Sequence, residues 1–79
     1  MKQKRNAESY DVLKILGKNI QKSRTDRNIS IKELSEKTGI REKYIIKIEK
    51  GEAIGMTTGH LFKIADALNE KIYILVKSI

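Results

Sequence analysis

Residues 30–51 read SIKELSEKTGIREKYIIKIEKG, and this stretch determines the predicted fold. Ser30 is followed three residues later by Glu33, the spacing of a capping box, so a helix is predicted to begin directly after Ser30. Gly39 supplies the positive φ that a sharp turn needs. A second helix is predicted over residues 41–50, with Gly51 as the residue that follows its end. The stretch therefore predicts two short helices joined by one tight turn.

The second of these helices is predicted to have one apolar and one basic face. Its inner positions follow the i, i+3, i+4 spacing and are Ile45, Ile48 and Glu49. The opposite face carries Lys43, Ile46, Lys47 and Lys50. Two helices, a tight turn and a basic outer face form the arrangement that places a helix in the major groove of DNA.

Upstream, apolar residues at helical spacing predict a first helix, which begins after Ser9 or Asp11 as its cap and ends near residues 27–28. Its inner stripe consists of Leu13, Leu16 and Ile20. One turn further the same stripe reaches Arg24. A charge facing the core needs a partner, and Glu49 is the other charged residue predicted on an inner face. We therefore predict a structural ion pair between Arg24 and Glu49.

Downstream, a fourth helix is predicted from Thr57 or Thr58 to Leu68. Residues 71–77 read KIYILVK, a short β-branched and aromatic run that predicts a strand. A lone strand has no partner within the chain, and an open apolar edge promotes aggregation. We expect it to pair with the same strand of a second copy and form a two-fold dimer. The strand residues are Ile72, Ile74 and Val76 on one side and Tyr73 and Leu75 on the other.

Composition narrows the class of protein. The chain has 79 residues and a net charge of +7, from 17 basic and 10 acidic side chains, which suits a polyanionic partner. It has no cysteine and one histidine, His60, so we expect no disulfide, no metal and no cofactor. No nucleophile with a base is evident, so an enzyme is not expected. No apolar run is long enough for a membrane span or a secretory signal, so a cytoplasmic protein is expected.

Spaced matches within residues 13–68 resemble the Xre-type helix-turn-helix family, which includes phage repressors and Cro proteins. The matching residues are Arg24, Ser30, Leu34, Gly39, Ile40, Tyr44, Ile45, Ile48, Glu49 and Gly51. The resemblance implies an all-α fold, a compact lambda-repressor-like helix-turn-helix domain of four to five helices, here with a short C-terminal β-strand. Residues 1–10 then form a flexible basic arm, residues 11–70 the DNA-binding domain, and residues 71–79 the dimerising strand.

The resemblance also implies which residues contact DNA. Base contacts fall on Glu42, Lys43, Ile46 and Lys47. Phosphate contacts fall on Ser30, Lys32, Arg41, Tyr44 and Lys50. For several of these residues a role without base readout stays open. Lys43 and Lys47 then touch only phosphates, and Glu42 only stabilises the helix N-terminus. Ile46 and the ring of Tyr44 then pack only against protein. One position departs from the family, because Ile31 stands where a phosphate-binding glutamine is common.

Residues 56–68, followed by the hydrophobic run, look like the HipB-like antitoxin branch, whose members dimerise, repress their own operon and bind a toxin. We therefore expect a sequence-specific repressor of double-stranded operator DNA, most simply an antitoxin with a cognate toxin as partner. The alternatives are a phage-type repressor, a restriction-modification controller, or a protein-interaction module. The arm over residues 1–10 is either a solvated tail or lies along DNA.

Overall fold

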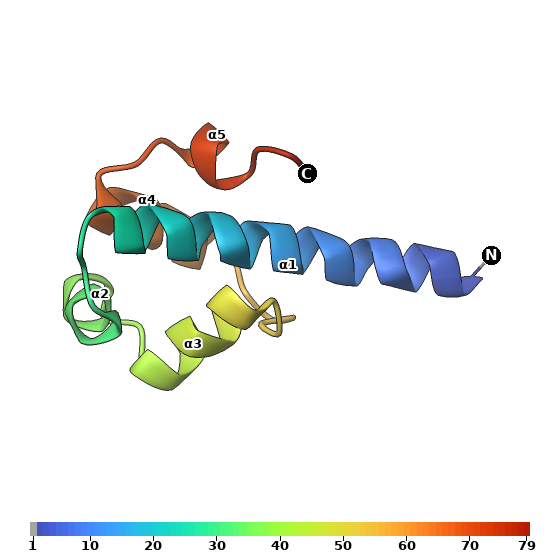
Figure 1. Cartoon of the computed structure of the whole chain (residues 1–79). Helices are drawn as coiled ribbons and strands as arrows, with labels where there is room; N and C mark the ends of the chain where they lie inside the picture. Colours follow the sequence, from blue (N-terminus) through green and yellow to red (C-terminus); the bar gives the residue numbers. More distant parts are fainter. Residues whose placement is uncertain (1) are drawn as a thin grey trace.

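The computed structural model describes residues 2–79, and it describes side chains from residue 11 onward. This part of the chain is all-helical (Figure 1). The helices are α1 (Lys2–Asp26), α2 (Ile31–Thr38), α3 (Glu42–Lys50), α4 (Thr58–Leu68) and α5 (Ile72–Leu75). Helix α1 packs against α3, α4 and α5, while α2 packs against α3 and α4. The predicted helical architecture is therefore present, with α1 as its longest member.

Helix α1 begins at Lys2, and the predicted caps Ser9 and Asp11 lie inside it. Residues 2–16 hold neither glycine nor proline, so nothing in this stretch breaks the helix. The N-terminal part of α1 extends past the other helices (Figure 1). Met1 and the side chains of residues 2–10 lie outside the described part, so the flexibility of the arm and its contact with DNA stay predictions.

The core lies where α1, α3 and α4 meet the shorter helices. Six side chains are almost completely enclosed: Ile20, Leu34, Ile45, Ile64, Leu68 and Leu75. Helices α1 and α3 approach very closely at Gly17, where a Cβ atom would lie 2.6 Å from the carbonyl oxygen of Glu49. This close approach fixes the position of α3 against α1.

The predicted C-terminal strand is wrong, because residues 72–75 form the helix α5 and no strand occurs within residues 2–79. A single strand would leave its backbone groups unpaired, whereas a helical turn pairs them internally, as in the bond from the amide of Val76 to the carbonyl of Ile72. Asn19 Nδ2 donates to the carbonyls of Leu75 and Lys77, at 2.8 and 2.9 Å.

The spacing of the buried side chains also follows a helix. Leu75 is fully enclosed, and Ile72 and Val76 are half-buried on the same side. The strand prediction instead placed Tyr73 beside Leu75, but Tyr73 is 63% exposed. The strand pairing predicted for residues 71–77 is therefore wrong, because this segment completes the core of its own chain, and dimerisation itself stays a prediction.

Candidate nucleic-acid interface

The turn between α2 and α3 is held by local hydrogen bonds. Ser30 Oγ accepts from the amide of Glu33 at 3.0 Å, and Glu33 Oε1 accepts in return from the amide of Ser30. Gly39 adopts a φ of +76° at the end of α2. The amide of Ile40 then donates to Thr38 Oγ1 at 3.1 Å, within the buried part of the turn. These bonds set the angle at which α3 leaves α2.

Helix α3 buries one face and exposes the other. Ile45 and Ile48 are buried in the core together with Glu49. The residues predicted to contact bases are all exposed: Glu42, Lys43, Ile46 and Lys47. Lys50 at the end of the helix is exposed as well. The structure thus brings the predicted contact residues to one accessible face, which carries three lysines and one glutamate.

Among the predicted phosphate contacts, Lys32 and Arg41 are exposed, whereas Tyr44 is half-buried. The ring of Tyr44 packs against His60, with ring centroids 5.2 Å apart and an interplanar angle of 53°. Ser30 is exposed, but its hydroxyl oxygen accepts the capping hydrogen bond described above. Arg41 precedes α3 without a side-chain capping bond, so the first amides of α3 stay available to an anion.

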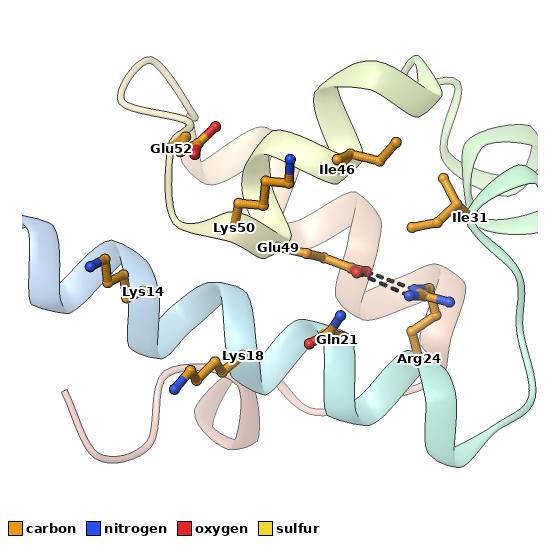
Figure 2. Close-up of a pocket in the computed structure, with 9 residues that line it drawn as sticks. All are labelled: Lys14, Lys18, Gln21, Arg24, Ile31, Ile46, Glu49, Lys50 and Glu52. Atoms are coloured by element: carbon orange, nitrogen blue, oxygen red, sulfur yellow. Dashed lines mark hydrogen bonds and ion pairs between the residues drawn. The ribbon is translucent and has the colours of Figure 1, made fainter.

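The structure brings Arg24 and Glu49 together at the junction of α1 and α3. Arg24 Nε lies 2.7 Å from Glu49 Oε2, and Arg24 Nη2 donates to Glu49 Oε1 at 3.0 Å (Figure 2). The two side chains are only 12% and 5% exposed. Hydrogen bonding to Glu49 raises the pKa of Arg24 above its ordinary value, so the guanidinium stays charged. The pair neutralises both charges beside the exposed face of α3.

This ion pair lies in the wall of a pocket of about 690 Å³ between α1 and α3 (Figure 2). Three lysines line this pocket: Lys14 and Lys18 of α1, and Lys50 of α3. Lys50 was predicted as a phosphate contact, whereas Lys14 and Lys18 were not identified from the sequence. Glu52 is also present, and Ile31 and Ile46 supply the apolar part. With Arg24 and Glu49 compensating each other, the lining retains a net positive charge. Only the packing of α1 across α3 reveals these lysines as neighbours of the predicted face.

The arrangement as a whole defines a class of protein. Two helices joined by a locked turn, with the second exposing a lysine-rich face beside a basic pocket, form a helix-turn-helix nucleic-acid-binding domain. Within residues 2–79, no helix combines the length and the apolar character that a membrane crossing requires.

Comparison with known proteins supplies the family. Residues 19–73, well over half of the chain, match the family model of the Cro/C1-type HTH DNA-binding domain. The chain belongs to this family and is a DNA-binding regulator. No curated protein matches the sequence.

Proposed function

We propose that this chain is a transcriptional repressor that acts by binding rather than by catalysis, and that it inserts α3 into the major groove of an operator. The observation that carries the proposal is the orientation of α3, in which Ile45 and Ile48 face the core while Lys43 and Lys47 face outward. Ammonium groups in these positions donate to guanine O6 and N7. Repression follows when the occupied operator overlaps a promoter.

The other two exposed residues of α3 have complementary roles in this proposal. The carboxylate of Glu42 accepts from the amino group of cytosine, and the side chain of Ile46 contacts a thymine methyl group. Phosphate contacts from Lys32, Arg41 and Lys50 hold the register without reading sequence. Two copies of the chain then bind half-sites about 34 Å apart on one face of the duplex.

The proposal is tested by selecting preferred duplexes from a random pool and measuring affinity against salt concentration. We expect one preferred sequence, and a steep fall in affinity as salt rises. Lys43→Ala and Lys47→Ala should each weaken operator binding by about tenfold, because a good base contact contributes about 1–3 kcal/mol of discrimination.

Lys22→Ala is the matched control for these variants. Lys22 is exposed, pairs with Asp26 at 3.1 Å, and lines a small pocket together with Lys77 near the C-terminus. The C-terminal segment lies on the opposite side of α1 from α3 (Figure 1). Wild-type operator affinity in both α3 variants would refute the role of α3. Tight binding of an acidic protein, with no sequence preference on DNA, would favour a protein-interaction module instead.

Within the repressors, we propose an antitoxin that regulates its own operon in the cytoplasm. The support is the resemblance of residues 56–68 to HipB-like antitoxins. The check is to read the adjacent gene and to express both products together. A neighbouring toxin that co-purifies with this chain supports an antitoxin. The absence of a toxin gene beside it would favour a phage-type repressor or a restriction-modification controller.

A further inference from the structure

A second pocket, of about 380 Å³, lies where the turn between α2 and α3 meets the start of α4. It is lined by Gly39, Ile40, Arg41, Tyr44, His60 and Lys63. Two of these side chains are cationic, one is a phenol and one an imidazole. Among residues 11–79, no carboxylate lines the pocket. The polar side chains of the lining are therefore suited to an anion.

His60 occupies an unusual place in this lining, because it also completes the N-terminal cap of α4. The amide of Thr57 donates to His60 Nδ1 at 3.1 Å, and Thr57 Oγ1 accepts in return from the amide of His60. Nδ1 must then be the acceptor of the ring, so the neutral imidazole carries its proton on Nε2.

The same ring is held in place by Tyr44, whose centroid lies 5.2 Å from that of His60. Nδ1 is turned back to the cap, so Nε2 lies on the side of the ring away from Thr57. Nε2 is then the N–H donor of a ring that lines the pocket, and Lys63 one turn along α4 adds an exposed ammonium group.

We propose that this pocket binds one phosphate of the DNA backbone, with His60 Nε2 and Lys63 as contacts in addition to Arg41 and Tyr44. The inference rests on the proposed function, because α3 in the major groove brings its first turn to the phosphates at the groove edge. A phosphate oxygen accepts from the imidazole N–H and from the ammonium group. The contact ties α4 to the DNA and fixes the depth of α3, without reading sequence.

Two substitutions separate this role from capping. His60→Glu keeps a residue that favours the third position of a capping box, so the melting temperature should be retained, but it places a carboxylate against the phosphate. Lys63→Gln removes an exposed ammonium group from the same pocket. Lys77→Gln is the matched control, since it changes the net charge by the same amount on the α5 side of the molecule.

We expect His60→Glu and Lys63→Gln each to weaken DNA binding by about fivefold or more, equally for the preferred duplex and for competitor DNA. Lys63→Gln should also reduce the slope of log affinity against log salt by about 0.9. Affinities within about twofold of the Lys77→Gln variant for both substitutions would overturn the inference while leaving the proposed function intact. Wild-type protein that binds no duplex would refute the proposed function itself.

Nitrogen NMR of the single histidine gives a direct readout on the wild-type chain. Addition of the preferred duplex should shift the Nε2 resonance of His60 and keep the proton on that nitrogen. A free anion in solution would accept the same hydrogen bonds as a phosphate of the DNA backbone. A shift caused by inorganic phosphate alone, with none caused by DNA at saturating concentration, would overturn the assignment to the DNA backbone.

Discussion

Arg24 joins three parts of the fold through one guanidinium group. Two of its nitrogens form a fork with the carboxylate of Glu49, at 2.7 and 3.0 Å. Its Nη1 donates to the backbone carbonyl of Ile29, at 2.8 Å, in the connection between α1 and α2. Both charged side chains are largely buried, and within residues 11–79 no buried side-chain polar atom lacks a hydrogen-bond partner. The pair therefore holds α1, α3 and the entry to α2 in one register.

Removing one partner of this pair should destabilise the chain strongly. We expect Glu49→Ala to lower the free energy of unfolding by about 3 kcal/mol, because the guanidinium of Arg24 is left buried and unpaired. Urea denaturation followed by circular dichroism measures this change. The double variant Arg24→Met with Glu49→Leu should lose much less, since no charge is stranded. A large loss of DNA affinity in Glu49→Ala with an unchanged melting temperature would instead give Glu49 a direct role in binding.

The parts of the fold that the sequence predicted well depend on local signals. The capping box at Ser30 and the glycines at positions 39 and 51 act over three or four residues, so the ends of α2 and α3 could be predicted closely. The partner of Arg24 could be predicted because two charges on inner stripes have few other ways to be compensated.

The parts that failed depend on distant contacts. Residues 71–77 favour a strand by composition, but Asn19 and the enclosed position of Leu75 select a helical turn. The proximity of His60 to Tyr44 and of Lys14 to Lys50 follows from helix packing, which short-range periodicity does not contain. The exposed face of α3 was predicted and is confirmed, whereas its contacts with DNA stay predictions.

The helical conformation of residues 72–75 can be tested by substitution. Leu75→Ala should lower the free energy of unfolding by about 3 kcal/mol, because it opens a cavity in the core. Asn19→Ala should cost about 1–2 kcal/mol through the loss of two hydrogen bonds to the end of α5. Tyr73→Ala is the control and should change stability by less than about 0.5 kcal/mol. Equal losses of stability in Leu75→Ala and Tyr73→Ala would contradict the helix, because a helix buries only Leu75, whereas a strand puts the two side chains on one face.

Glu70 should make part of the stability dependent on pH. The hydroxyl of Ser23 donates to its carboxylate at 3.0 Å and, with further bonds from the Lys71 amide and Arg27, holds the pKa of Glu70 below its ordinary value. A lowered pKa in the folded state means that the stabilisation is complete above the ordinary carboxyl pKa of about 4.3 and disappears as the pH falls through the lowered value.

The corresponding experiment compares wild type with Glu70→Gln by urea denaturation across pH. The variant should be less stable at pH 7, and the two chains should converge once the pH falls below the lowered pKa of Glu70, where the carboxyl group is protonated in both states. A difference in stability that stays constant from pH 7 to pH 2 would show that the charge of Glu70 contributes nothing.

Gly17 gives the opposite of the usual response to a glycine-to-alanine substitution within a helix. Alanine normally stabilises a helix interior by about 1 kcal/mol relative to glycine. At position 17, however, the new Cβ would lie 2.6 Å from the carbonyl oxygen of Glu49, and neither backbone can move without disturbing the core. We expect Gly17→Ala to destabilise the chain by about 2 kcal/mol and to weaken DNA binding through displacement of α3. Gly59→Ala in α4 is the matched control, because its Cβ would meet only Thr57 Oγ1 at 3.4 Å. That variant should be as stable as wild type or more so, and a stabilising Gly17→Ala would contradict the close approach of α1 and α3.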